Sequence, residues 1–502
     1  MPYKRIQTLE ELKDYLAESH RVAFDLLTAP NTKHRSEKYA PADSLKRHVV
    51  GFSFSTNEDS GVYLPLEHLA GENAIDKKAV WGWLADFFTN PQITKITHNL
   101  VIKSQYLYAY GVVIQEPCYD TFAAAQLSYD KEDGMRVPDD CKLKALLRDC
   151  LEMHIPSYEN TTGGRYFDEL DPSTESVVRY ACTRSDYPLR LYKHFNYWFN
   201  QRLPKHRLVV EKIDSPSYIY EGITKHNEAY YYDCMSPPQN SGILNNIIAP
   251  KGSAILALNF PQLDFRVGAF YCKDENLLEI FQKGKNVHAF IASRINDITI
   301  EEASDTNHPK CNTRLAIAEA CDLDALSVPL PIELQKKIKT KSQHDIELSE
   351  CETIISKLKI SYPRLFKWMK DEVRQAGFRK YAETWFGRRK SISKITSSNW
   401  NKKALAESTV INTIVNGTAT DIIKLFLGRI IKGLPDRPWL RPILQDHDRL
   451  VFEIPETEVQ NTISFIKNCM RSCPSDDFSI PITISVSIGK SLNELKNFNN
   501  AS

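Results

Sequence analysis

A short apolar run near the middle of the chain places the strongest constraint on its fold. Residues Ala254 to Leu258 are all apolar, which is typical of a strand buried on both faces. Asn259 and Pro261 follow directly, so a polar side chain stands at the carboxyl end of that strand. These residues alone predict a core strand followed by a helix cap, and a ligand site at the strand end is the alternative.

The length and charge of the chain limit the class of protein. Its 502 residues are enough for about two to four domains. Lys and Arg total 64 against 63 for Asp and Glu, so any surface that binds nucleic acid must be local. No apolar run of membrane-spanning length and no signal peptide is evident, so we expect a cytoplasmic protein with no membrane partner.

Hydrophobic patterns divide the chain into successive parts. Strand and helix patterns over residues 1–200 predict a mixed-sheet α/β domain. The predicted strands cover residues 22–27, 49–55, 61–66 and 93–98, and the predicted helices cover residues 79–88, 104–110 and 121–127. Residues 204–250 show little regular pattern and predict a connector. From Ala254 the pattern is mostly helical to about Lys432, and the strands around Asp448 predict a hairpin with that residue at its turn.

Two sets of segments carry a family resemblance. The first set is FDLLT from Phe24, HNLVIKSQYLYAYG from His98, CYDTFAAAQLS from Cys118 and YACTRSDYPLRLY from Tyr180. The second set is NFPQLDFRVGAFYC from Asn259, YAETWFGRRKS from Tyr381, AESTVINTIVNGTATDIIK from Ala406 and QDHDRLVFEIP from Gln445. In this order they resemble the 3'-5' exonuclease and the palm motifs of family A DNA polymerases, the large-fragment type of bacterial DNA polymerase I.

The resemblance implies three parts. We expect an inactive exonuclease-like domain with a ribonuclease H-like α/β fold over residues 1–200, a connector with a vestigial thumb over residues 201–250, and an α+β polymerase palm and fingers over residues 251–502, with the fingers at about 290–380. Each of the two thumb helices of the family needs about 20 residues to span ~30 Å. The interval from Arg202 to Tyr232 is broken by Pro204 and by Ser215-Pro216, so it predicts no such pair of helices.

The exonuclease motifs imply metal-binding carboxylates that this chain has largely lost. Where the family's first motif has an aspartate and a glutamate, the chain has Asp25 and Leu27, and the two later aspartate positions carry Lys103 and Arg184. Two divalent cations require clustered carboxylates. We therefore expect an inactive exonuclease in which Asp25 pairs with Lys103 or Arg184, and an ordinary solvated acid at a strand end is the alternative for Asp25.

The palm motifs show the same kind of change. Asn259 stands where the first palm motif has an aspartate, and Arg449 replaces the acidic residue that follows Asp448. Asp264 stands at the position of the family's glutamate, and His447 resembles the histidine beside the primer end. A neutral amide and an added cation suit two Mg²⁺ ions poorly, so we expect no metal and no cofactor. The alternative is a single Mg²⁺ ion held by Asp448 and Asp264.

The fingers helix of the family clamps the triphosphate with an arginine and a lysine and stacks an aromatic ring on the incoming base. The nearest segment begins at Arg314 and puts Ala318 at the lysine position, Asp322 at the aromatic position, and Leu326 where the family has tyrosine. Such a segment has lost the contacts that select a nucleotide. It predicts a helix buried through its apolar residues.

A set of basic and amide side chains is the candidate nucleic-acid-binding surface. Segments like these lie near template and primer strands in the family, where phosphate contacts need no catalytic metal. The candidates are Arg379, Lys380, Arg388, Arg389, Lys390, Lys402, Lys403, Asn412 and Asn416. A solvated basic face is the alternative for each run of charge.

Three functions are compatible with these patterns. The first is a catalytically inactive polymerase homologue that binds DNA or RNA, or that serves as an accessory or scaffold for a replication or repair protein. The second is a weak or atypical DNA polymerase that works through Asp448 and Asp264. The third is a protein-interaction module with no nucleic-acid role, which the near-neutral charge also permits.

Overall fold

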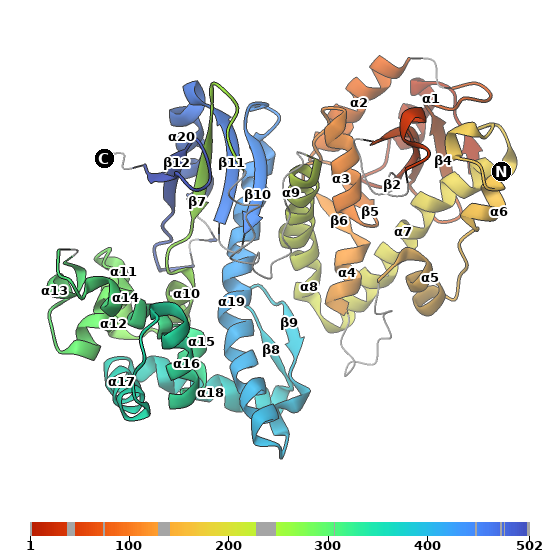
Figure 1. Cartoon of the computed structure of the whole chain (residues 1–502). Coiled ribbons are helices and arrows are strands. Elements are labelled where there is room, and N and C mark those ends of the chain that lie inside the picture. Colours follow the sequence, from red (N-terminus) through yellow and green to blue (C-terminus); the bar gives the residue numbers. More distant parts are fainter. Residues whose placement is uncertain are drawn as a thin grey trace. The chain divides into compact units, whose positions relative to one another are not determined.

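The computed structural model describes residues 3–37, 46–73, 76–128, 141–226, 247–305, 307–446, 449–471, 474–475 and 477–498. The chain forms two compact units. Unit 1 comprises Met1–Leu258, Lys424–Met470 and Val486–Ser502, and unit 2 comprises Asn259–Ile423 and Arg471–Ser485. Figure 1 labels the helices and strands along the chain.

The N-terminal part of unit 1 is built on a mixed six-stranded sheet with the order β1-β4-β3-β2-β5-β6. Its strands are β1 (Tyr3–Arg5), β2 (Arg21–Pro30), β3 (Arg47–Ser55), β4 (Gly61–Pro65), β5 (Thr94–Thr97) and β6 (Cys118–Asp120). Its helices are α1 (Leu9–Leu16), α2 (Lys77–Thr89), α3 (Leu100–Ala109), α4 (Thr121–Ser128), α5 (Leu143–Leu151), α6 (Tyr158–Thr162) and α7 (Glu175–Arg202), with the short helices η1 (Thr32–His34) and η4 (Phe167–Glu169). The predicted α/β domain and its predicted strands are confirmed.

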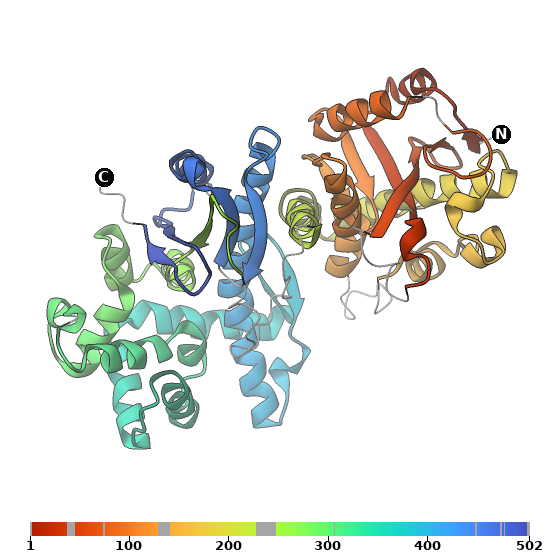
Figure 2. The ribbon, with the colours of Figure 1, turned by 45° about the horizontal axis from the view of Figure 1, so that its top comes forward.

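Helices cover both faces of this sheet, as Figures 1 and 2 show. Successive side chains of a strand point to opposite faces. On β2, Phe24 packs edge-on against Phe88 of α2 at a ring distance of 4.8 Å. Ala23 and Leu27 belong instead to apolar clusters built with α7. Asp25 lies between them in sequence and shares their face, so β2 directs its carboxylate toward α7.

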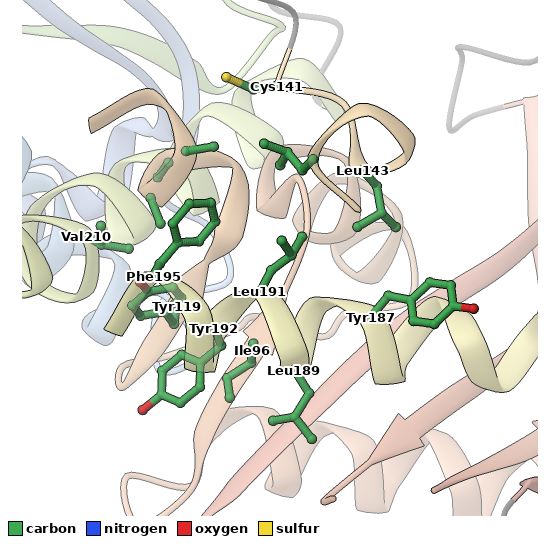
Figure 3. Packing of buried hydrophobic residues seen from close by; sticks show 14 of the residues in the cluster. Ile96, Tyr119, Cys141, Leu143, Tyr187, Leu189, Leu191, Tyr192, Phe195 and Val210 are labelled. Carbon is green, nitrogen blue, oxygen red and sulfur yellow. The ribbon is translucent and has the colours of Figure 1, made fainter. Parts of the chain in front are cut away.

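A large apolar cluster lies where α7 crosses the sheet (Figure 3). Ile96 of β5 and Tyr119 of β6 contribute from the sheet, and Leu191 and Phe195 contribute from α7. Tyr119 meets Tyr192 edge-on with their ring centroids 4.8 Å apart. Burial of these large side chains holds α7 rigidly on the sheet, which fixes the residues that α7 presents to β2.

The prediction of an irregular connector from residue 204 is wrong for residues 204–226. They form a continuous helical run of α8 (Pro204–Val209), the π-helical turn η5 (Val210–Asp214) and α9 (Ser215–His226), which packs against α3. Pro204 lies in the first turn of α8, where its missing N–H leaves no bond unmade. The π-helical turn directly before Ser215 and Pro216 widens the helix where proline breaks the ordinary bonding pattern. Within residues 201–226 there is one helical run rather than two thumb helices, and residues 227–246 lie outside the described part.

A second sheet in unit 1 contains the apolar run that opened the sequence analysis. Its order is β10-β11-β7-β12-β13, so the run lies on the central strand. The strands are β7 (Ser253–Asn259), β10 (Arg441–Asp446), β11 (Arg449–Pro455), β12 (Ser485–Gly489) and β13 (Lys496–Asn497), and η8 (Glu456–Glu458) and α20 (Val459–Met470) follow β11. The predicted hairpin is present as antiparallel β10 and β11, with Asp446 opposite Arg449. Its predicted turn residues, His447 and Asp448, lie outside the described residues.

Unit 2 is mostly helical. Its elements are α10 (Leu263–Cys272), α11 (Glu275–Gln282), α12 (Val287–Asn296), α13 (Ile300–Ser304), α14 (Cys311–Ala320), α15 (Leu323–Ser327), α16 (Pro331–Ser342), α17 (Leu348–Ser361), α18 (Pro363–Arg379), the hairpin β8 (Tyr381–Glu383) and β9 (Arg389–Ser391), η7 (Ser393–Thr396) and the start of α19 (Trp400–Gly433). Among the helices that the structure describes, α19 alone is long and apolar enough to cross a membrane. Because 56% of its most apolar window is buried inside the protein, α19 equally fits the core of a folded unit.

Candidate functional sites: an altered exonuclease centre and a palm-like sheet

Asp25 lies at the centre of the first site. It occupies the middle of β2 opposite Ser53 of β3, and it is 3% exposed. The backbone N–H of Leu26 donates to Asp25 Oδ1 at 2.8 Å. An ionised carboxylate at this depth must be paired, because burial without a partner costs several kcal/mol. Asp25 is therefore not the solvated acid that the sequence left as an alternative.

Two cations supply that pairing. Lys103, which is 8% exposed, comes from α3 and contacts Asp25 Oδ1 through Nζ. Arg184 comes from α7 and donates from Nε to Asp25 Oδ2 at 2.9 Å. The sequence predicted that Asp25 pairs with one of these residues. The structure brings both to it, and each cation occupies one carboxylate oxygen.

The charges around Asp25 alter the titration of the site. Burial by itself raises the pKa of Asp25, but the attraction of Lys103 and Arg184 and their hydrogen bonds lower that pKa below its ordinary value. Burial together with the same two cations lowers the pKa of His98 to about 3. The histidine is therefore neutral near pH 7, and no third positive charge has to be accommodated there.

The residues at this site do not fit the two divalent cations that the family's exonuclease chemistry requires. Asp25 has both oxygens engaged by cations, and Leu27 is packed in an apolar cluster with α7. The nearest further acid on β6, Asp120, is fully buried and accepts from the backbone N–H groups of Asn99, Leu100 and Phe122. Within the described ranges, no group of three or more His, Cys, Asp or Glu side chains is placed to hold a metal ion.

The described residues of the second predicted site lie on β7, α10 and β11. Asn259 ends β7 and is half-buried, and Asp264 lies half-buried in the first turn of α10. Arg449 opens β11 and is half-buried. Because His447 and Asp448 lie outside the described residues, the expected grouping of Asp448 with Asp264 stays a prediction.

The candidate fingers segment is not one helix. The chain leaves α14 at Cys321, and the Asp322 side chain caps α15 by accepting from the N–H of Ala325 at 3.0 Å. Of the apolar residues expected to bury this segment, Leu323 is buried, whereas Leu315 and Ala316 are half-buried. Asp322 also pairs with Lys337 of α16 at 2.6 Å. The position implied for a stacking aromatic ring therefore carries a capping, ion-paired acid.

The arginines predicted to contact nucleic acid pair with acids of unit 2. Arg388 donates from Nε and a terminal nitrogen to Asp421 Oδ1 at 3.0 and 2.7 Å, and Asp421 is fully buried. Arg389 pairs with Glu383 at 2.5 Å across the hairpin. Arg379 pairs with Glu372 of α18 at 2.9 Å. These contacts hold the hairpin and its flanking helices together.

The remaining candidates divide into two groups. Asn412 donates to Asp324 of α15 at 2.7 Å, and Asn416 donates to Asn412 at 3.4 Å, so both amides have partners along α19. Three lysines, Lys390, Lys402 and Lys403, are exposed, whereas Lys380 is half-buried and donates to the Thr396 hydroxyl at 3.3 Å. Phe378 and Trp400, which lie near them in sequence, are 78% and 61% exposed. Exposed cations interspersed with aromatic rings are the composition of a surface that binds single strands.

The fold thus combines a domain built on a mixed sheet with a second sheet and a long, mostly helical insertion. The family model for the 3'-5' exonuclease matches residues 3–197, and the model for DNA polymerase family A matches residues 333–494. Over these two ranges the chain is similar to family A DNA polymerases that carry a 3'-5' exonuclease domain, and its predicted fold class is confirmed.

Relatives and a solved structure agree with this assignment. DNA polymerase I of Pseudomonas aeruginosa is 28% identical over 248 residues, which are 49% of this chain and 26% of that protein. The thermostable DNA polymerase I of Thermus thermophilus is 25% identical over 254 residues, which are 50% of this chain and 28% of that protein. These matches thus span about a quarter of each relative's length. The POL domain of Pol1 from M. smegmatis, solved in complex with DNA primer-template and dNTP, has the same fold, with a TM-score of 0.68 and 17% identity over 98% of this chain and 99% of that chain.

Arg47 is a residue of the first site that sequence reasoning missed. It lies on β3, and it lines a pocket together with Arg184 and Tyr180 of α7. No motif marks it, because it is far from Arg184 in sequence and comes near only when β3 pairs with β2. An arginine at the end of a predicted strand carries no further signal by itself.

Proposed function

We propose that this chain is a catalytically inactive DNA polymerase I-like protein that binds nucleic acid. The observation that carries the proposal is the capture of both oxygens of Asp25 by Lys103 and Arg184. Both oxygens of this carboxylate are in contact with cations, and two buried cations repel Mg²⁺ from the same place. Loss of the metals removes the activation of water and the stabilisation of the leaving oxygen on which phosphodiester cleavage depends.

The palm supports the same proposal through the chemistry of its side chains. Asn259 offers a metal only a neutral amide oxygen, and Arg449 adds a positive charge beside Asp448. The candidate fingers segment has Asp322, a capping acid paired with Lys337, at the position of the family's stacking aromatic ring. Phosphoryl transfer by this family relies almost wholly on metal ions and cationic side chains to stabilise the transition state. These changes therefore remove most of that stabilisation.

Binding of nucleic acid survives the loss of metal ligands, because phosphate contacts need only positive charge. The three exposed lysines on β9 and α19 supply that charge, and Phe378 and Trp400 supply rings for stacking. We infer that DNA is the partner, since the solved structure with the same fold holds a DNA primer-template. With this chemistry, the chain could act as an accessory or scaffold for a replication or repair protein.

Assays of nucleotide release and primer extension test the proposed inactivity. With Mg²⁺ present, the full chain is expected to release no nucleotides from a single strand and to add none to a primer-template, because neither site holds a metal. Asp25→Ala and Asp448→Ala variants should give the same null result. Extension that Asp448→Ala abolishes would instead establish the weak polymerase that uses Asp448 and Asp264 with one Mg²⁺ ion.

A titration of affinity against salt tests nucleic-acid binding. We expect Lys390→Ala combined with Lys402→Ala to weaken binding to a primer-template and to reduce the slope of log affinity against log salt by roughly 2, one counterion per lost phosphate contact. The matched control is Lys78→Ala combined with Lys144→Ala, two exposed lysines of unit 1. Equal slopes for the two double variants, or no binding by the unmodified chain, would favour the protein-interaction module.

A further inference from the structure

A second pocket of unit 1 lies outside the Asp25 cluster. Its volume is about 290 Å³, close to the lower limit of about 300 Å³ for small-molecule sites. Its walls come from the segment that joins β2 to η1, from β3, from the loop after β4, from the start of α2, and from η4. Asp25, Leu27, Lys103 and Arg184 are not among the described residues that line it. This pocket is therefore separate from the altered exonuclease centre.

Hydrogen bonds fix the walls of this pocket. Asn73 holds the loop after β4, because its side chain accepts from the His68 N–H at 2.7 Å and donates to the His68 carbonyl at 2.8 Å. Burial lowers the pKa of His68 to about 4, so its ring carries a single proton near pH 7. Nδ1 of that ring donates to the Leu170 carbonyl at 2.7 Å, and Nε2 accepts from the Tyr63 hydroxyl at 2.6 Å. These walls are held without a ligand, so binding does not have to order them.

Asp168 of η4 is the buried acid of this pocket, and 1% of its surface is exposed. Its Oδ2 pairs with Arg35 and lies 3.5 Å from His48 Nε2. Its other oxygen, Oδ1, is buried and has no hydrogen-bonding partner in the described part of the chain. Buried acceptors are ordinarily paired, because leaving a bond unmade is costly. A ligand that donates an N–H or O–H to Oδ1 removes that cost.

The negative charge of Asp168 is only partly compensated. Burial raises the pKa of Asp168, and the attraction of Arg35 and His48 does not bring that pKa back to its ordinary value. Burial also lowers the pKa of His48, so its ring is mostly neutral near pH 7. A further positive charge beside Asp168 would favour its ionised form.

The ion pairs at the pocket contain more negative than positive charge. Arg35 is shared between Asp168 and Glu169. Glu67, which is half-buried and lines the pocket, pairs through one oxygen with Lys77 at 3.1 Å. Three carboxylates thus meet two cations in these pairs. The pocket therefore complements a ligand with one positive charge.

A primary ammonium group matches these features. It carries one positive charge and three N–H donors, which suit Asp168 Oδ1 and the Glu67 carboxylate. A guanidinium fits less well, because it pairs best with two oxygens of one carboxylate and Arg35 already holds one oxygen of Asp168. In the described ranges, no group of three or more His, Cys, Asp or Glu side chains is placed to hold a metal ion. Leu69 lines the pocket and is 69% exposed, so it offers apolar surface to an alkyl stem.

We propose that this pocket binds a primary alkylammonium group, with Asp168 Oδ1 and the Glu67 carboxylate accepting its N–H bonds and Leu69 contacting its stem. The source is either a free polyamine or a lysine side chain of a partner protein. This site goes beyond the proposed binding of nucleic acid, and it does not depend on the loss of metal ligands at Asp25. Its failure and the failure of the proposed function are therefore measured separately.

Calorimetric titration of the full chain with butylammonium chloride at low ionic strength tests the site. We expect saturable binding that Asp168→Asn weakens at least about tenfold, because a charge-assisted contact is lost. Glu67→Gln should weaken binding by roughly threefold, since a half-buried acid is partly screened by water. The matched control is Asp86→Asn, which changes an exposed acid of α2 outside the pocket and should bind as the unmodified chain does.

Further probes separate charge, hydrogen bonding and source. Butan-1-ol keeps the alkyl stem without the charge and should give no saturable heat. Tetramethylammonium keeps the charge without an N–H donor, and it should bind at least roughly threefold more weakly than butylammonium. Spermidine and a peptide with a single lysine are compared with butylammonium, and the one that binds more tightly identifies the source of the ammonium group.

Three results would overturn the site. The first is the absence of saturable heat with butylammonium, and the second is equal affinity of Asp168→Asn and the unmodified chain. The third is binding of tetramethylammonium as tight as that of butylammonium, because Oδ1 would then accept no bond from the ligand. If Asp168→Asn fails to fold, Glu67→Gln, whose side chain is half-buried, carries the same test against Asp86→Asn.

Discussion

Replacing Lys103 by methionine is expected to lower the free energy of unfolding by roughly 3 kcal/mol, the lower end of the cost of breaking a buried ion pair. The side chains of Lys103 and Asp25 are 9% and 4% exposed, so water cannot replace the lost contact. Arg184 still holds one oxygen of Asp25, which keeps the loss at that lower end. Urea-induced unfolding of unit 1, followed by circular dichroism, measures the change.

Two variants test whether loss of the buried Lys103–Asp25 pair causes the expected decrease in stability. Adding Asp25→Asn to Lys103→Met should recover most of the loss, because no uncompensated charge is left. Lys13→Met, which removes an exposed pair with Glu10, should change stability by less than about 0.5 kcal/mol.

The pH dependence of the same variant has a definite sign. Pairing lowers the pKa of Asp25 in the folded state. Its stabilising contribution is therefore present above the unfolded pKa of about 3.9 and is lost as pH falls through the lower folded value. The difference between Lys103→Met and the unmodified chain should shrink in acid, and a difference that grows there would contradict the assignment.

Replacing Arg388 by alanine is the second change with a large expected effect, a loss of roughly 3 kcal/mol in unit 2. Asp421 of α19 is fully buried and accepts two hydrogen bonds from Arg388 and one from Thr384 at 2.9 Å. Without Arg388, the charge of Asp421 is supported by fewer donors. Arg388→Lys should restore only part of the stability, because one ammonium group cannot reproduce the two N–H bonds that converge on Asp421 Oδ1.

Controls separate this structural contact from nucleic-acid binding. Arg374→Ala breaks an exposed pair with Asp371 on α18 and should leave stability within about 0.5 kcal/mol of the unmodified chain. Lys390→Ala should lower DNA affinity while stability is kept, whereas Arg388→Ala should lower both. An Arg388→Ala variant as stable as the unmodified chain would show that the contact with Asp421 contributes little.

Much of the first domain could be predicted because its patterns are local. The segments that form β2, β3 and β4 are short runs rich in apolar residues, a pattern that predicts buried strands. Their order also matched the family's motifs. The helical run over residues 204–226 could not be predicted in this way. Its prolines signal a break, whereas the chain stays helical through the π-helical turn before Pro216, and α9 packs against α3, which is distant in sequence.

The sequence also did not predict which charged side chains of the candidate nucleic-acid-binding surface are exposed. The motif from Gly387 to Lys390 identified a basic segment, yet it gave no indication that Arg388 would be drawn inward by Asp421 while Lys390 stays exposed. Partners that lie on other elements decide whether a charged side chain is available to a ligand.

The sequence by itself determined the family-like order of motifs, the buried strand that ends at Asn259, and the loss of acids at Leu27, Lys103 and Arg184, because residue identity at a motif position needs no coordinates. Only the tertiary structure decided that both Lys103 and Arg184 reach Asp25, and that Arg47 joins Arg184 around one pocket. The reason is distance: β2, β3, α3 and α7 bring together residues far apart in the chain, and the strength and direction of an ion pair depend on burial and on the partner in space.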